Sequence, residues 1–176
     1  GLQAIAEAVV AIRTGGAEVV VAVGTENISQ LPYYVKDARW GARMGHKSFE
    51  DGVIDILTWP LNNSHNGVTA ENVANRFRVT RQEQDQYALE SHRRAVEAIR
   101  AGKFREEILP VELRDRKGNV TVFDTDEGPR DGLTIEKLAR LKPCFIQENG
   151  TVTAGNSSSL NDGAAAVVVM SRRRAE

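Results

Sequence analysis

The feature that most limits how this chain can fold is an unbroken apolar run, Ala164–Met170, that ends abruptly at Ser171. Such a run is typical of a strand that is covered on both faces. Gly155 and Gly163 lie on either side of the hydroxyl-rich stretch Asn156–Ser159, where they let the backbone turn tightly and approach a ligand closely. The sequence therefore predicts a small-molecule site at the end of a strand.

The first residues predict a helix followed by another buried strand. Apolar side chains recur at helical spacing over Leu2–Ile12, and two glycines at 15–16 are expected to end this helix. Ala17–Val23 then has the pattern of a short buried strand. These elements indicate one α/β sheet domain, whose two pieces are separated by an insertion of about residues 28–148.

The insertion is expected to begin with a long excursion over the surface. Thr25–Gly67 is rich in Gly, Pro, aromatic and basic residues and has few periodic features. Within it, Leu31–Tyr34 and Trp40 look exposed, which favours a subunit contact.

Two helices are predicted next. Thr69 is expected to cap a short helix that ends near Phe77, and the capping box Thr80–Glu83 is expected to open a longer helix that ends at Gly102. The inner face of the longer helix is expected to consist of Tyr87, Ala88, Ser91, Ala95, Val96 and Ile99.

The rest of the insertion predicts a hairpin and a third helix. The hairpin is expected over residues 108–123, with its turn near Gly118, and the helix over residues 134–141. Thr151–Thr153 is then expected to begin the strand that resumes the sheet domain.

Composition excludes several classes of protein. The 23 Lys and Arg residues balance 24 Asp and Glu residues, so the net charge of −1 gives no general attraction for nucleic acid. No apolar run approaches the roughly 20 residues that span a bilayer. A single cysteine, Cys144, excludes an intrachain disulfide and a cysteine metal cluster, and fits the reducing cytoplasm. Cys144 is expected to be a small core residue, and His92 to lie on a water-facing helix surface without a chemical role.

Four short motifs occur in one order along the chain. They are Gly1-Leu2-Gln3-Ala4, Gly24-Thr25-Glu26-Asn27, Gly67-Val68-Thr69-Ala70-Glu71-Asn72 and Thr153-Ala154-Gly155-Asn156-Ser157-Ser158. In this order, with a capped helical insertion between them, they resemble the thiolase family, specifically its biosynthetic acetyl-CoA acetyltransferases. The resemblance runs from the first residue to the last.

The resemblance implies an α/β fold: a partial thiolase fold, part of one αβαβα half, with an inserted α+β loop domain. Residues 1–27 would belong to the N-terminal core domain, residues 28–148 would form the loop domain that binds coenzyme A, and residues 149–176 would supply the closing strand of the core. The chain is accordingly expected to be an internal fragment that covers the later part of the N-terminal half.

The activity that the resemblance implies is the condensation of two acetyl-CoA molecules to acetoacetyl-CoA and free coenzyme A, through an acyl-cysteine intermediate. In the family a histidine activates the nucleophilic cysteine and a second cysteine acts as base. All three lie outside the matching stretch, so no catalytic residue is expected here and the fragment alone is expected to be inactive. Coenzyme A and acetyl-CoA are expected as substrates, with no permanently bound cofactor or metal, no membrane partner, and a homotetramer as the full-length assembly.

The residues that the resemblance carries over concern binding. Ser158 would contact the pantetheine arm, beside a close backbone approach at Ala154 and Gly155, and Arg130 would lie at the nucleotide end of coenzyme A. Phe145 would line the pantetheine tunnel.

His65 would lie near the substrate thioester. It is followed by Asn66, where the biosynthetic enzymes commonly have methionine. Acyl-chain preference therefore stays open.

Two alternatives remain. The chain could be a stand-alone module for coenzyme A binding or oligomerisation, or part of a degradative 3-ketoacyl-CoA thiolase. His65 argues against the degradative enzyme, whereas Asn66 leaves it open. Without neighbouring strands, Val19–Val23 and Ala164–Met170 would expose apolar edges, so the fragment is expected to self-associate.

Overall fold

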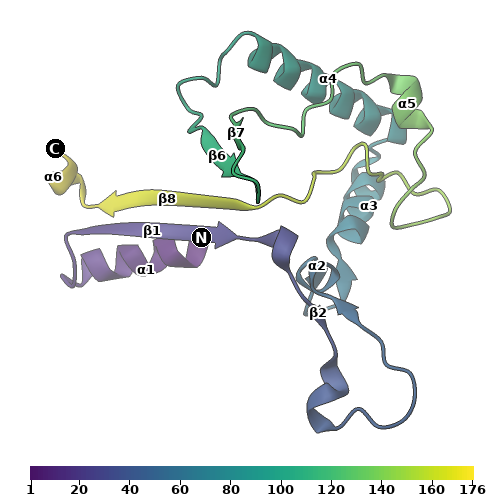
Figure 1. Ribbon diagram of the computed structural model, residues 1–176, viewed down its shortest axis with the longest axis horizontal. Helices are drawn as coiled ribbons and strands as arrows, with labels where there is room; N and C mark the ends of the chain where they lie inside the picture. The colour runs from purple at the N-terminus through teal and green to yellow at the C-terminus, as the bar shows by residue number, and fades with distance from the viewer. The chain divides into compact units, whose positions relative to one another are not determined.

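The computed structural model describes residues 1–176 and is of mixed α/β type. Contacts within the chain define two compact units, residues 1–57 with 160–176, and residues 58–159. The first unit contains α1 (Leu2–Arg13), β1 (Val19–Glu26), the 3-10 helices η1 (Ile28–Gln30) and η2 (Lys36–Trp40), β2 (Tyr33–Tyr34), β3 (Glu50–Asp51), α2 (Gly52–Ile56), β8 (Gly163–Met170) and α6 (Arg172–Ala175). The second unit contains β4 (Thr58–Trp59), β5 (Ser64–His65), α3 (Asn66–Phe77), α4 (Arg81–Arg100), β6 (Val111–Arg114), β7 (Val120–Phe123) and α5 (Ile135–Ala139) (Figure 1).

In the first unit, strands from opposite ends of the chain form one antiparallel pair. The register of β1 and β8 runs from Val19 opposite Met170 to Glu26 opposite Gly163. The helix α1 lies along one face of the pair, where Ala8 becomes buried (Figure 1). The helix and the two strands that the apolar pattern predicts are confirmed.

The expectation that Ala164–Met170 is covered on both faces is wrong for these residues. β8 pairs with one strand only, and α1 covers one face of that pair, so the other face stays open. Val21 and Val168 stand opposite each other in the register and each exposes 60% of its surface. The apolar run correctly predicted a strand, but no element of this structure covers the second face of that strand.

The stretch after β1 is held by polar contacts. The backbone N–H of Ser29 donates to Oδ1 of Asp162 at 2.9 Å, and the Ser29 hydroxyl donates to the other carboxylate oxygen. The hydroxyl contact and then the backbone contact hold the pKa of Asp162 below its ordinary value. Lys36 forms an ion pair with Glu50, whose hydrogen bond raises the pKa of Lys36.

In the second unit, α4 begins as the sequence predicts. The hydroxyl of Thr80 accepts the N–H of Glu83 at 3.2 Å, and the Glu83 carboxylate accepts the N–H of Thr80 at 2.7 Å. The hydrogen bonds from Thr80 lower the pKa of Glu83. Gly102 follows the helix with a φ of 67°, a conformation that favours glycine.

The predicted inner face of α4 is only partly confirmed. Ala88, Ala95, Val96 and Ile99 are half-buried, but Ser91 is exposed and Tyr87 exposes 80% of its surface. The residue of α4 that is buried most completely is Asp85. The hydrogen bonds of the Asp85 carboxylate, to Arg81 and Asn156, therefore hold one side of the first turns of α4 inward.

The hairpin and the third helix are also confirmed. β6 and β7 pair around a turn in which the Asp115 carboxylate accepts the N–H groups of Lys117 and Asn119, and Gly118 has a φ of 86°. Thr134 caps α5. None of the helices combines the length and apolar character needed to cross a lipid bilayer.

Candidate ligand-binding site

The segment 151–159, the stretch with the serine-rich turn, has no strand partner. The prediction that Thr151–Thr153 begins a strand is wrong, because side chains, one of them from α3, take up the backbone N–H groups that a neighbouring strand would bond. Glu71 of α3 accepts the N–H groups of Thr151 and Val152, each at 2.8 Å, and the Thr151 hydroxyl at 2.8 Å. A carboxylate thus replaces an adjacent strand.

Glu71 is held as a buried carboxylate. Its side chain lies in α3, and only 2% of the residue is exposed. Burial alone would raise its pKa, but the hydrogen bonds from Val152 and Thr151, together with the charge of Arg81, outweigh burial and lower the pKa. The Glu71 carboxylate is therefore charged in the folded protein, and the hydrogen bonds from residues 151–152 stabilise that charge.

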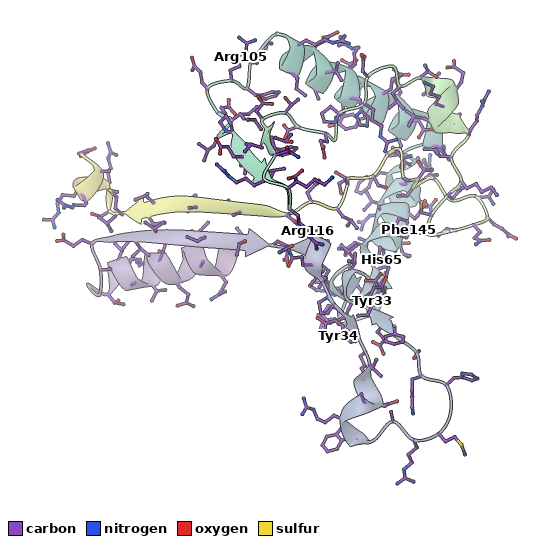
Figure 2. The ribbon with its side chains drawn as sticks, viewed as in Figure 1. Tyr33, Tyr34, His65, Arg105, Arg116 and Phe145 are labelled. Carbon is purple, nitrogen blue, oxygen red and sulfur yellow. The ribbon has the colours of Figure 1, made fainter.

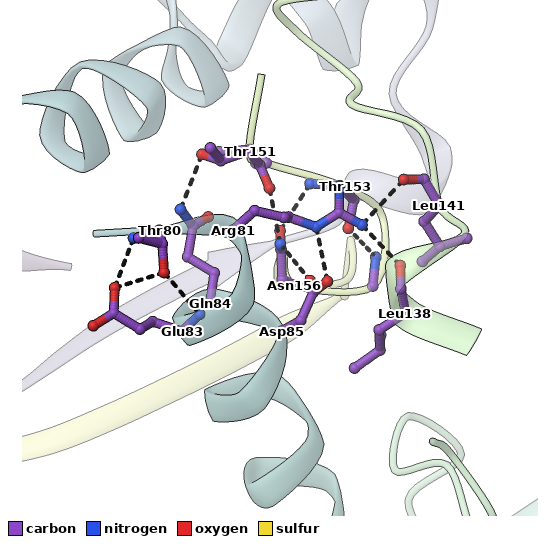
Figure 3. Close-up of polar contacts among 12 residues, drawn as sticks. Thr80, Arg81, Glu83, Gln84, Asp85, Leu138, Leu141, Thr151, Thr153 and Asn156 are labelled. Carbon is purple, nitrogen blue, oxygen red and sulfur yellow. Dashed lines mark hydrogen bonds and ion pairs between the residues drawn. The ribbon is translucent and has the colours of Figure 1, made fainter. Parts of the chain in front are cut away.

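A second buried carboxylate holds the turn that follows (Figure 3). Oδ2 of Asp85 accepts Nε of Arg81 at 2.8 Å, and Oδ1 accepts the side-chain amide of Asn156 at 2.9 Å. The same amide donates to the carbonyl of Thr151 at 3.0 Å, while its oxygen accepts the N–H of Thr153 at 2.7 Å. Gln84 donates to the Thr151 hydroxyl at 2.9 Å. The first turns of α4 therefore fix the conformation of residues 151–156.

Arg81 extends this network to α5. Its terminal nitrogen donates to the carbonyl oxygens of Leu138 and Leu141, at 2.8 and 3.1 Å, at the end of that helix. A side chain at Gly155 would place its Cβ 2.5 Å from each of the same two leucine side chains, and Leu138 is 1% exposed. Glycine is required here because the turn packs directly on α5.

A cavity of about 360 Å³ lies where this turn meets α4. Its walls come from α4, from residues 128–129 and from the turn, and consist of Tyr87, Ala88, Ser91, His92, Ala95, Gly128, Pro129, Gly155, Asn156, Ser157, Ser158 and Ser159. Its lining combines apolar and hydroxyl side chains, which suits a ligand with an alkyl chain and amide groups. Of the predicted binding residues, Gly155 and Ser158 lie here together.

Arg130 lines a neighbouring cavity of about 330 Å³. Two other arginines of this cavity are paired, Arg93 with Glu90 and Glu97, and Arg100 with Asp131, whereas Arg130 forms no ion pair. An unpaired guanidinium in a cavity is suited to bind an anionic group.

His92 joins the two cavities, since it lines both. Its Nδ1 accepts the backbone N–H of Arg130 at 3.1 Å, and its side chain is half-buried. The expectation that His92 faces water is therefore wrong. The histidine is turned toward residues 128–130 because their backbone supplies its hydrogen-bond donor.

His65 and Phe145 form a separate pair (Figure 2). Their rings stack with centroids 4.8 Å apart and planes inclined by 28°. His65, and not the predicted Thr69, caps α3, because its Nδ1 accepts the N–H of Gly67 at 3.0 Å. A Cβ at Gly67 would lie 2.2 Å from the Phe145 ring, so glycine at this position lets the ring reach the start of the helix.

The remaining predicted residues lie outside these clusters. Ala154 is exposed and lines neither cavity. Cys144 is also exposed, so the expectation of a core cysteine is wrong. Its backbone N–H donates to Val152 at 2.9 Å, which fixes the main chain but leaves the thiol at the surface.

The supporting carboxylates were not recognised from the sequence, although a signal for one of them is present. Gly67, Glu71 and Ala74 are the buried residues of α3 and follow helical spacing. A charged residue within such a stripe requires a polar partner, and this would have identified Glu71. Asp85 offers no comparable pattern, because α4 is rich in charged residues on all sides.

Comparisons with known proteins agree with the fold. A family model described as "Thiolase, N-terminal domain" matches residues 1–173. The chain is 52% identical over 176 residues to a beta-ketothiolase of Cupriavidus necator and 51% identical over 177 residues to an acetyl-CoA acetyltransferase of Pseudomonas aeruginosa. All of this chain is covered in both matches, but only 44% and 45% of those two proteins.

A solved structure gives the same picture. The structure resembles the acetyl-CoA acetyltransferase of Bacillus anthracis with a TM-score of 0.86 and 45% identity, over 99% of this chain and 44% of that one. The chain therefore spans less than half the length of the relatives it matches.

Proposed function

This chain belongs to the thiolase family, and we propose that it forms the coenzyme A-binding part of an acetyl-CoA acetyltransferase that condenses two acetyl-CoA molecules. The observation that carries the proposal is the cavity in which the turn of Gly155 and Ser158 faces α4. Its apolar walls suit the methylene groups of a pantetheine arm, and the Ser158 hydroxyl suits its amides. The names of two relatives, an acetyltransferase and a beta-ketothiolase, support the substrate class.

Arg130 is proposed to bind the nucleotide end of coenzyme A. Its guanidinium has no ion pair, and His92 joins its cavity to the cavity that contains Ser158. A ligand that extends through both cavities would place its neutral arm on the serine turn and its phosphates beside the arginine. His65 is proposed to lie near the substrate thioester and Phe145, whose ring stacks on it, to line the pantetheine tunnel.

These residues by themselves are proposed to bind coenzyme A without turning it over. Acyl transfer of the thiolase type uses one cysteine as nucleophile and another as base. The 176 residues contain a single cysteine, and it is exposed at position 144 outside both cavities.

The Arg130 assignment has a direct kinetic test. In the protein that contains this chain, Arg130→Ala is expected to raise KM for coenzyme A about tenfold in the thiolysis of acetoacetyl-CoA, because a charge-assisted contact is lost. With pantetheine as the thiol acceptor, which lacks phosphates, the same variant should keep the wild-type KM. Arg94→Ala is the control, since Arg94 pairs with Glu90 on α4 and lines neither cavity. An equal rise in KM for both acceptors would contradict the assignment.

We also propose that the protein is a homo-oligomer in which residues 31–49 contact another copy. Large side chains are exposed there, including Tyr33 at 64%, Trp40 at 85% and Phe49 at 71% (Figure 2 shows Tyr33). Trp40→Glu is expected to lower the mass measured by sedimentation equilibrium, because a charge would be placed in an apolar contact. An unchanged assembly would show that this stretch is not the interface.

A further inference from the structure

We propose that Asp85 is a positioning residue for coenzyme A, which acts through Asn156 to hold the serine turn in its binding conformation. The inference rests on the proposed function, since it explains how the turn beside α4 is prepared for the ligand. Asp85 itself lines neither cavity, whereas Asn156 lines the cavity with the serines.

The turn needs such a residue because it has no strand beside it. Its backbone donors are nevertheless taken up: those of Thr151 and Val152 by Glu71, that of Thr153 by the Asn156 side chain, and that of Gly155 by the Thr153 hydroxyl at 3.2 Å. Side chains, and not a sheet, therefore decide the path of the main chain. Asn156 is central, because its single amide group bonds to three partners at once.

Asp85 is one of three groups that fix which way the Asn156 amide faces. A side-chain amide has a donating and an accepting end, and reversing it would break all three of its bonds. A carboxylate only accepts, so Asp85 adds to the preference of the Thr151 and Thr153 backbone for the orientation in which the nitrogen points toward α4 and the oxygen toward the N–H of Thr153.

Asp85 is itself held in place. It is 2% exposed and bonded to Arg81, whose terminal nitrogen is bound to the end of α5. The serines that follow Asn156 are placed by the same turn. The Ser157 hydroxyl donates to the carbonyl of Thr153 at 2.7 Å, and Ser158 lines the cavity.

An exchange of the two side chains tests the inference in the full-length protein. Asn156→Asp places a second carboxylate against Asp85 and removes the donor, so KM for coenzyme A should rise about tenfold, as expected for one strong polar contact. Adding Asp85→Asn restores a donor and acceptor pair, because the new amide can accept from Arg81 and donate to the new carboxylate. The double variant should recover part of the lost affinity but not all of it, because the new carboxylate at position 156 still cannot donate to the carbonyl of Thr151.

Two further measurements separate positioning from other effects. All assays are made at a temperature at which circular dichroism shows every variant to be folded, so a residue that only stabilises the fold would leave KM unchanged. Pantetheine serves as a second acceptor, because it has no phosphate that an added carboxylate could repel. If Asp85 positions the turn, KM should rise in the single variant and fall again in the double variant by similar factors for both acceptors. Gln86→Glu is the matched control, since it adds one negative charge at an exposed position next to Asp85.

The outcomes are distinct. The inference is supported if Asn156→Asp raises KM for both acceptors and adding Asp85→Asn lowers it again. Three results would each overturn it: a rise in KM for coenzyme A alone, a rise in KM that Asp85→Asn does not reduce at all, or a wild-type KM in the folded single variant. If the wild-type protein neither binds nor uses coenzyme A, it is the proposed function that fails.

Discussion

Replacing Glu71 by alanine is expected to lower the free energy of unfolding by about 3 kcal/mol, because the buried N–H groups of Thr151 and Val152 lose their acceptors together. Glu71→Gln should lose about half as much, since one oxygen remains but an amide NH₂ faces the donors. Unfolding in urea, followed by circular dichroism, measures both values. Glu106→Gln is the control, because that side chain is exposed and lies outside the contacts of residues 151–156.

The pH dependence of this loss identifies the charge as its cause. Glu71 has a lowered pKa in the folded protein, so its stabilising contribution is fully present above the ordinary value of 4.5 and disappears as the pH falls through the folded value. The stability difference between wild type and Glu71→Gln should therefore narrow below pH 4.5. A difference that stays constant down to acid unfolding would mean that the shape of the side chain matters and its charge does not.

Gly155→Ala is expected to destabilise the protein by about 2 kcal/mol through overpacking. The added methyl group would lie 2.5 Å from the side chains of Leu138 and Leu141, and Leu138 is buried too deeply to move aside. Because the displaced turn carries Ser158, KM for coenzyme A should also rise by about tenfold.

Thermal unfolding and thiolysis kinetics measure the two effects of this substitution. Gly163→Ala is the matched control, since a methyl group there meets no atom within 4 Å. Adding Leu141→Ala should recover part of the lost stability, because that leucine is partly exposed and can be shortened at small cost. No recovery would show that the strain lies in the backbone of the turn.

Local patterns predicted the elements of this chain well, for identifiable reasons. The capping box at Thr80 and the turn at Gly118 depend on contacts between residues close in sequence, and both are confirmed. The partner strands were visible as apolar runs, and β1 does pair with β8. How much of each strand is covered was not predictable, because it depends on which other segments pack against it.

The site was harder to predict because its supports come from distant positions. Glu71 and Thr151 are far apart in sequence, and nothing local to either residue indicates that a carboxylate will replace a strand. The start of α3 shows the same limit: Thr69 fits the local capping pattern, but His65 has the aromatic contact with Phe145 that holds its ring in place. The segment 151–159 was singled out from its sequence as a candidate site, whereas its conformation depends on contacts with α3 and α4 that the sequence does not show.

The capping bond of His65 also fixes where this ring can carry a proton. Nδ1 accepts the N–H of Gly67, so in the neutral ring the proton lies on Nε2. The same holds for His92, whose Nδ1 accepts the N–H of Arg130. Both rings therefore present a donor, and not a lone pair, on the side away from the backbone. An Nε2–H held in this direction is suited to donate to an oxygen of a ligand.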